Sequence, residues 1–287
     1  MDRENLINLI NQMRQNSIER YKNNIVTGKE IYIPSSQGKT RALIHLSSDL
    51  NAPVYFNIHG GGFVMGCPEN EDHFCQRLYE QTNMTIINID YVLAPEHTFP
   101  EDKEEVYSVI KYVVEHADMF HANPKLMVIG GHSAGANIAA AVCMMANNSN
   151  EFQFVSEILD YPPLDIFTSP YDKFYAEGAI NPQIASAFDK AYRSEEDAKN
   201  PLCSPVFATN EQLIGLPPAL IITCEIDSLR EEAEEYAKKL MQAGVEVTGK
   251  RFYDVAHGFT MGHDKKAIEA QQYIIDYITV SYTHLTL

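Results

Sequence analysis

Short apolar runs rich in β-branched residues alternate with longer helical patterns along most of this chain. The predicted strands are residues 30–33, 41–46, 54–58, 85–90, 126–129, 155–159, 219–223 and 246–252. The predicted helices are residues 72–81, 101–116, 134–146, 229–243 and 265–278. Strands that are almost continuously apolar and are separated by helices predict a mostly parallel sheet with helices on both faces, which is an α/β fold.

Two segments fall outside this alternation. Residues 1–28 are polar and helix-like, and residues 164–215 separate two predicted strands by a stretch rich in Pro, Tyr, Phe and Asp. An excursion of this length should have structure of its own and often a function. We therefore expect a core of residues 29–163 and 216–280, with residues 1–28 and 164–215 packed together as a cap over the strand ends. Residues 281–287 do not continue the preceding helical pattern, and we interpret them as foreign or truncated sequence.

A G-x-S-x-G motif is the clearest candidate for chemistry. Gly131-His132-Ser133-Ala134-Gly135 follows the predicted strand 126–129 and opens the predicted helix 134–146. A sharp strand-to-helix turn would expose the Ser133 hydroxyl at the carboxyl edge of the sheet. The N-terminus of the helix would also favour the negative charge that develops during attack. The motif occurs by chance in unrelated proteins, but its position between a strand and a helix favours a nucleophile.

A run of three glycines follows an earlier predicted strand. His59-Gly60-Gly61-Gly62-Phe63 comes directly after residues 54–58. Glycines let backbone N–H groups approach a substrate and point at one place, which predicts an oxyanion hole. A phosphate-binding loop is the alternative, but the lysine of a Walker A motif does not follow. We expect His59 and Gly60 to support the loop, not to transfer protons.

A serine hydroxyl needs a base, and that base needs an acid, both on loops after later strands. Asp227 follows the predicted strand 219–223, and His257 follows 246–252. The order Ser133, Asp227, His257 is that of a nucleophile-elbow hydrolase, in which His257 accepts the serine proton and Asp227 holds the imidazole tautomer. Asp227 could instead be a helix N-cap. The remaining alternatives are Asp160, Asp165 and Glu225 for the acid and His263 for the base.

Composition argues against several other classes of function. The net charge is −17, which disfavours binding to nucleic acids or to acidic membrane surfaces. The five cysteines form no C-x-x-C pair, so we expect neither a disulfide framework nor a zinc site. No secretory pattern opens the chain, and no apolar run is long enough to span a bilayer. We expect a cytoplasmic protein without metal or other cofactor. An edge strand or the last helix could pair subunits in a homo-oligomer.

Five blocks in order make the chain resemble the hormone-sensitive-lipase-like esterases of the α/β-hydrolase superfamily. They are H-G-G-G-F-V-M-G at 59–66, D-Y-V-L-A-P-E-H at 90–97 with F-P at 99–100, G-H-S-A-G-A-N at 131–137, D-S-L-R-E-E at 227–232 with Tyr236, and H-G-F at 257–259. The resemblance covers residues 28–278. It implies a mostly parallel eight-stranded sheet with a helical cap, and hydrolysis of carboxylic esters without a cofactor. It places the oxyanion donors on Gly61, Gly62 and Ala134.

The chain departs from this family at two positions beside its motifs. His132 stands where members often have Asp, and Val92 stands where they often have Arg. Both positions are peripheral to the proposed triad, but they could affect pocket polarity or loop support. We expect a small-molecule ester with a short to medium acyl chain as substrate. An amidase, a peptidase or an acyltransferase could use the same three residues, whereas a non-catalytic receptor is disfavoured because His257 is present.

Overall fold

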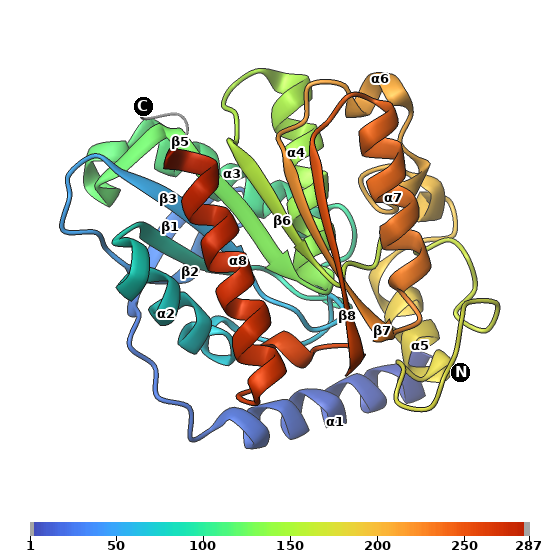
Figure 1. The fold of residues 1–287 in the computed structure, drawn as a ribbon. Coiled ribbons are helices and arrows are strands. Elements are labelled where there is room, and N and C mark those ends of the chain that lie inside the picture. The colour runs from blue at the N-terminus through green and yellow to red at the C-terminus, as the bar shows by residue number, and fades with distance from the viewer. Residues whose placement is uncertain (1–2, 284–287) are drawn as a thin grey trace.

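A computed structural model describes residues 3–283 and contains one sheet of eight strands between two layers of helices (Figure 1). The strands are β1 (Lys29–Ser35), β2 (Gly38–His45), β3 (Ala52–Ile58), β4 (Thr85–Asp90), β5 (Ala122–His132), β6 (Ser156–Asp160), β7 (Ala219–Ile226) and β8 (Val247–Ala256). The helices are α1 (Arg3–Tyr21), α2 (Asp72–Thr82), α3 (Glu101–Glu115), α4 (Ala134–Ser149), α5 (Pro182–Tyr192), α6 (Asn210–Leu213), α7 (Arg230–Gln242) and α8 (Lys265–Thr283). Every predicted strand and helix is present, which confirms the α/β prediction.

The strand order explains where a site can form. The order is β1-β2-β4-β3-β5-β6-β7-β8; β2 is antiparallel to β1 and β4, and all later pairs are parallel. The chain leaves β3 toward one edge of the sheet and leaves β5 toward the other. The carboxyl ends of β3 and β5 therefore form a topological switch point, where open α/β sheets bind their ligands.

Two hydrophobic cores hold the layers together. Val109 of α3, Ile138 of α4 and Tyr236 of α7 are fully buried in the core on one face of the sheet. Leu78 of α2 and Ile274 of α8 are fully buried in the core on the other face. Because both faces are covered, the central strands contain apolar residues at nearly every position, which is the pattern that the sequence shows.

The segments outside the alternation lie at the carboxyl ends of the strands. In Figure 1, α1 runs across the ends of β7 and β8 and reaches the neighbourhood of α5. Helices α5 and α6 were not predicted from the sequence. Helix α5 begins with Pro182, and the side chain of Asn181 accepts the N–H of Gln183 at 2.8 Å as an N-cap. This Asn-Pro pair and the helical spacing of apolar residues from Ile184 to Tyr192 are the local signals for α5.

The expectation that the helical pattern stops before residue 281 is wrong. Helix α8 continues to Thr283, and the hydroxyl of Ser281 donates to the backbone oxygen of Tyr277 at 2.8 Å. The ring of Tyr282 packs against the core under α8. The origin of residues 281–287 remains a prediction, and residues 284–287 lie outside the described part of the chain.

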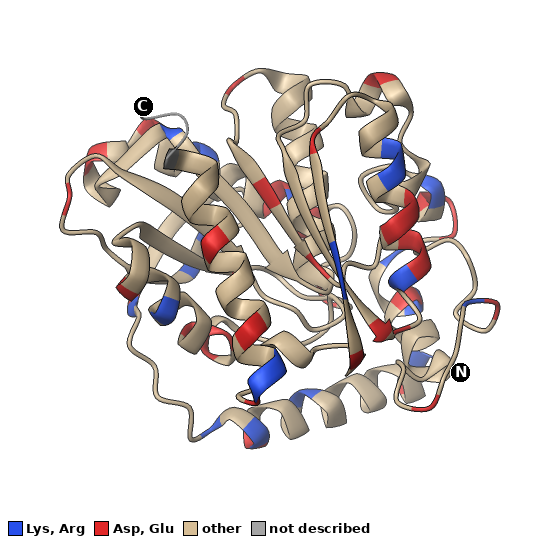
Figure 2. Cartoon of the chain, in the orientation of Figure 1, with Lys and Arg blue, Asp and Glu red and all other residues tan. Residues whose placement is uncertain are grey.

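Charge is spread over the surface helices. Acidic residues, red in Figure 2, gather on α7, which has four glutamates and buries Ala233, Tyr236 and Leu240 against the sheet. This is the arrangement of an amphipathic helix that packs on a core. Between residues 3 and 283, no helix has the length and apolar character needed to cross a membrane.

Candidate active site

Ser133 occupies the single-residue turn between β5 and α4. Its backbone has φ 54° and ψ −121°, a strained conformation for a residue with a side chain. Its N–H donates to the backbone oxygen of Asp160 at 2.9 Å. A side chain on Gly135 would place its Cβ 2.0 Å from the oxygen of Ile58, so only glycine lets α4 approach β3 this closely. The turn therefore holds the hydroxyl in one place beside the end of β3.

The predicted base and acid lie beside this hydroxyl. Nε2 of His257 is 2.8 Å from Oγ of Ser133, and Nδ1 of His257 is 2.8 Å from Oδ2 of Asp227. The Asp227 side chain is only 1% exposed. Its other oxygen accepts the N–H of Leu229 at 3.0 Å, so the carboxylate also orders the turn into α7. A neutral imidazole with its proton on Nδ1 can donate to Asp227 and accept from Ser133 at the same time.

The other candidates for acid and base are engaged elsewhere. The side chain of Asp165 accepts hydrogen bonds within its own loop. The side chain of Glu225 accepts the N–H of Asp254 at 2.8 Å. The ring of His263 lies against the ring of His73, with centroids 4.9 Å apart. None of these contacts brings a side chain to the hydroxyl of Ser133.

The three-glycine loop turns back on itself directly after β3. The oxygen of Gly61 accepts the N–H groups of Val64 and Met65 at 3.2 and 3.1 Å. Gly61 has φ 134°, and a Cβ there would lie 1.9 Å from the oxygen of Met65. A side chain at this position is therefore incompatible with the turn.

The predicted oxyanion donors lie on both sides of the nucleophile turn. A Cβ on Gly60 would lie 3.5 Å from Cβ of Ser133, so the loop adjoins the serine. Gly61, Gly62 and Ser133 line the same cleft. Ala134 is the first residue of α4, where an α-helix leaves its N–H groups without intrahelical acceptors. These N–H groups can stabilise a negative oxygen beside Ser133.

Buried side chains support the loop from below. The carboxylate of Glu71 accepts the N–H of Gly60 at 2.8 Å and the side-chain amide of Asn57 at 2.9 Å. The ring of His59 stacks on that of Tyr91 with centroids 4.3 Å apart, and the Tyr91 hydroxyl donates to the oxygen of His59 at 3.1 Å. These contacts hold the backbone at the start of the three-glycine loop in place. Glu71 was not predicted, because nothing local distinguishes it from the acidic residues around it.

A second buried network, also not predicted, lies under the nucleophile turn. Nδ1 of His132 is 2.8 Å from Oδ2 of Asp160, and the hydroxyl of Thr260 donates to the same oxygen at 2.5 Å. Burial by itself favours the neutral ring, but the carboxylates of Glu71 and Asp160 raise the pKa of His132 above its ordinary value. Thr260 lies in the short helix just after His257. The network therefore links the nucleophile turn to the loop that carries the base.

These residues line a cleft of about 750 Å³ at the carboxyl ends of the strands. Residues of α1, the three-glycine loop, the nucleophile turn, α5 and the loop after β8 form its walls. A concave site of this size suits a small molecule. Within the part of the chain that the structure describes, no group of three or more His, Cys, Asp or Glu residues is arranged to hold a metal ion.

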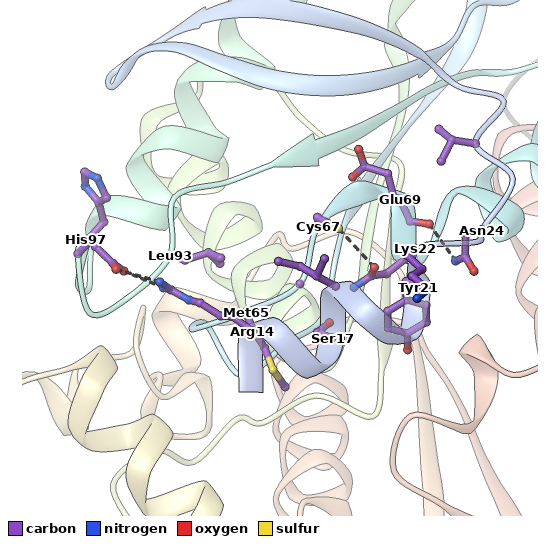
Figure 3. Close-up of a pocket in the computed structure, with 15 residues that line it drawn as sticks. Arg14, Ser17, Tyr21, Lys22, Asn24, Met65, Cys67, Glu69, Leu93 and His97 are labelled. Carbon is purple, nitrogen blue, oxygen red and sulfur yellow. Dashed lines mark hydrogen bonds and ion pairs between the residues drawn. The ribbon is translucent and has the colours of Figure 1, made fainter. Parts of the chain in front are cut away.

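A second cavity of about 620 Å³ shares lining residues of α1 with the cleft, and Figure 3 shows it. Arg14 of α1 crosses one end of this cavity. Its Nε donates to the oxygen of Val64 at 2.7 Å, and its terminal nitrogens donate to the oxygen of Ala94 at 2.8 Å and to both carboxylate oxygens of Glu96. Arg14 thereby binds α1 both to Val64, just after the three-glycine loop, and to the segment that follows β4.

Comparisons with known proteins match both the sequence and the structure. A family model for the alpha/beta hydrolase fold matches residues 55–261. The chain is 34% identical over 241 residues to the carboxylic ester hydrolase LipN of Mycobacterium tuberculosis, which covers 80% of this chain and 63% of that protein. It is 32% identical to the esterase LipI of the same organism, over 72% of this chain and 66% of that protein. The chain thus spans less than two thirds of the length of either relative.

Solved structures match over nearly the whole fold. The esterase of Pyrobaculum calidifontis is 30% identical with a TM-score of 0.84, and the match covers 98% of this chain and 94% of that one. EstE1, a thermostable carboxylesterase from a metagenomic library, is 30% identical with a TM-score of 0.88, over 95% of this chain and 97% of that one. The eight-stranded sheet is therefore that of solved esterases.

Proposed function

This chain belongs to the Abhydrolase_3 family of α/β hydrolases, the hormone-sensitive-lipase-like group, and on this premise we propose that it is a serine carboxylesterase. The observation that carries the proposal is the position of the His257 ring, 2.8 Å from Oγ of Ser133 on one side and 2.8 Å from Oδ2 of Asp227 on the other. The names of the relatives, esterases and carboxylic ester hydrolases, support esters over amides as substrates.

The proposed reaction has two halves. Ser133 attacks the ester carbonyl while His257 takes its proton, and the carboxylate of Asp227 stabilises the imidazolium that forms. The N–H groups of Gly61, Gly62 and Ala134 donate to the tetrahedral oxyanion. His257 then protonates the leaving alcohol, which leaves an acyl group on Ser133. Water attacks the acyl-enzyme, His257 takes its proton and returns it to Ser133, and the carboxylic acid is released.

We propose that residues 1–28 and 164–215 form a cap that sets the size of the substrate. Both segments contribute walls to the cleft, α1 from one side and α5 from the other. A cleft of about 750 Å³ enclosed in this way favours esters with short to medium acyl chains. The cap would also exclude water from the site, which strengthens the electrostatic interactions inside it.

Ser133→Ala tests the nucleophile. The variant should lose on the order of 10⁶ in turnover of p-nitrophenyl butyrate, because the attacking atom is gone. The matched control is Ser48→Ala, in the loop before β3 at the opposite end of the strands. The control should keep its activity and label with a fluorophosphonate, whereas Ser133→Ala should do neither. Wild-type rates in Ser133→Ala would remove this residue from the mechanism.

A series of p-nitrophenyl esters tests the size of the substrate. We expect kcat/KM of the wild type to fall steeply from the butyrate to the palmitate ester, because the longer chain exceeds the cleft. A rise along the same series would contradict a short-chain esterase.

A further inference from the structure

One carboxylate of the cleft differs from the others. Glu71 and Asp165 accept the hydrogen bonds described above, and Asp264 accepts the N–H of Ala267 at 2.9 Å. The carboxylate of Asp189 also lines the cleft but accepts no hydrogen bond and forms no ion pair with any residue between 3 and 283. It is therefore the one cleft carboxylate in this range whose acceptor positions are unused.

The position of Asp189 makes its negative charge costly. It lies in the last turn of α5, where the helix dipole is also negative. Burial raises its pKa to about 6, against the opposing effect of Lys173 and Arg193. A partly buried charge without a partner destabilises the folded chain. A carboxylate in such a position can take a cationic partner from a molecule bound in the cleft.

The nearby cations, Lys173 and Arg193, make their direct contacts with groups other than Asp189. Nζ of Lys173 is 2.6 Å from the carboxylate of Glu232 and donates to the oxygen of Asp165 at 2.6 Å. The guanidinium of Arg193 donates to the oxygen of Ile166 at 2.7 Å. Neither forms an ion pair with Asp189. The negative charge on this wall of the cleft is therefore not neutralised by a direct partner.

Helix α5 also brings this charge near the reaction. Phe188 precedes Asp189, and a Cβ on Gly62 would lie 2.3 Å from the ring of Phe188. Residue 188 is thus in contact with the three-glycine loop, and residue 189 is its neighbour on the same helix. Asp189 therefore lies on the part of α5 that borders the proposed oxyanion loop.

We propose that Asp189 determines the specificity of the cleft by selecting esters that carry a cationic group, either a protonated amine or a quaternary ammonium. The inference rests on the proposed esterase function and names its substrate class. An ammonium beside Asp189 would gain an ion pair in a partly enclosed cleft, where such a pair is stronger than in water. The net charge of −17 would also attract cationic substrates over neutral ones.

Two pairs of esters with matched shapes test this inference. The first pair places the charge on the acyl side and compares ethyl 3-aminopropanoate with ethyl butanoate. The second places it on the alcohol side and compares butanoylcholine with 3,3-dimethylbutyl butanoate. The measurement is the ratio of kcat/KM for the cationic ester to that for its neutral partner. This ratio cancels any effect of a substitution on the catalytic residues themselves.

The variants are Asp189→Asn and the matched control Glu196→Gln. Glu196 lies on the surface shortly beyond α5, and its substitution removes the same charge outside the cleft. We expect Asp189→Asn to lower the ratio by about 10-fold or more for at least one pair. Glu196→Gln should leave both ratios near those of the wild type.

Equal ratios in the wild type and Asp189→Asn for both pairs would overturn the inference. Continued hydrolysis of ethyl butanoate in that experiment would leave the esterase proposal standing, so the two failures can be told apart. Thermal unfolding separates folding from recognition: Asp189→Asn should melt at or above the wild-type temperature, because an unpaired charge is gone. A lowered melting temperature would contradict the unpaired state of Asp189.

Discussion

The edge of the sheet that carries the proposed chemistry and the helix that covers it are anchored in different ways. Glu71, His132 and Asp160 are almost fully buried under the edge, and each has hydrogen-bond partners there. Helix α1 buries only Leu6 and Ile10 along its whole length. The proposed reacting groups are thus fixed by a dense polar network. Helix α1 has few buried contacts, so its detachment should cost less free energy than disruption of that network.

The largest expected effect is on the network. Asp160→Ala should lower the free energy of unfolding by about 3–5 kcal/mol, because it leaves His132 buried without its partner. Denaturant unfolding measures the change. Asp276→Ala, on the exposed side of α8, is the control and should change stability by less than about 0.5 kcal/mol. Similar values for the two variants would show that the edge is no better anchored than the surface.

The stability difference between the wild type and Asp160→Ala should depend on pH, and the sign of that dependence can be predicted. The pKa of His132 is raised in the folded wild type, so protonation of this ring stabilises the fold. The stabilisation is fully present at pH values below the ordinary histidine pKa, and it is lost as the pH rises through the folded-state pKa. Asp160→Ala removes one cause of the raised pKa. The difference in unfolding free energy between wild type and variant should therefore shrink as the pH rises above the ordinary histidine pKa. A constant difference would mean that His132 carries no charge in the folded state.

The next effect is on turnover. Gly61→Ala should lower kcat on a short ester by on the order of 10²–10³, because the new Cβ displaces the loop that carries the proposed oxyanion donors. Gly249→Ala is the control, since a Cβ there meets nothing within 4 Å. Comparable turnover in the two variants would show that the loop adapts as easily as an exposed strand.

The smallest effect is expected at the covering helix. Arg14→Ala removes the hydrogen bonds that bind α1 to the oxygens of Val64 and Ala94, and should cost about 1–2 kcal/mol of unfolding free energy. KM for a short ester should rise while kcat changes little, because the helix shapes the cleft without touching the reacting atoms. Arg3→Ala, at the exposed start of the same helix, should leave both constants unchanged. A fall in kcat alone would place α1 with the catalytic edge instead.

Local signals account for what could be predicted from the sequence. The positions of Ser133, Asp227 and His257 follow from the strands that precede them, and the structure brings their side chains together. Glu71 and Asp160 could not be assigned, because their roles depend on partners distant in sequence. The Thr260 contact with Asp160 spans 100 residues. Helix α5 was missed for another reason: it is short, and the segment around it is rich in proline, aromatic and charged residues, which obscured a helical apolar spacing that is present at Ile184, Ala187, Phe188, Ala191 and Tyr192.

Because Phe188 of α5 packs against Gly62, a movement of α5 would affect both the entry of a substrate and the three-glycine loop. The phenyl ring fills space that the glycine leaves empty, so lifting α5 to admit a molecule would also remove the packing beside a proposed donor of the oxyanion hole. A molecule would then enter while α5 is lifted, whereas the site would be fully reactive only after α5 has returned. Such coupling favours molecules small enough to let α5 return to its place over the cleft during each cycle.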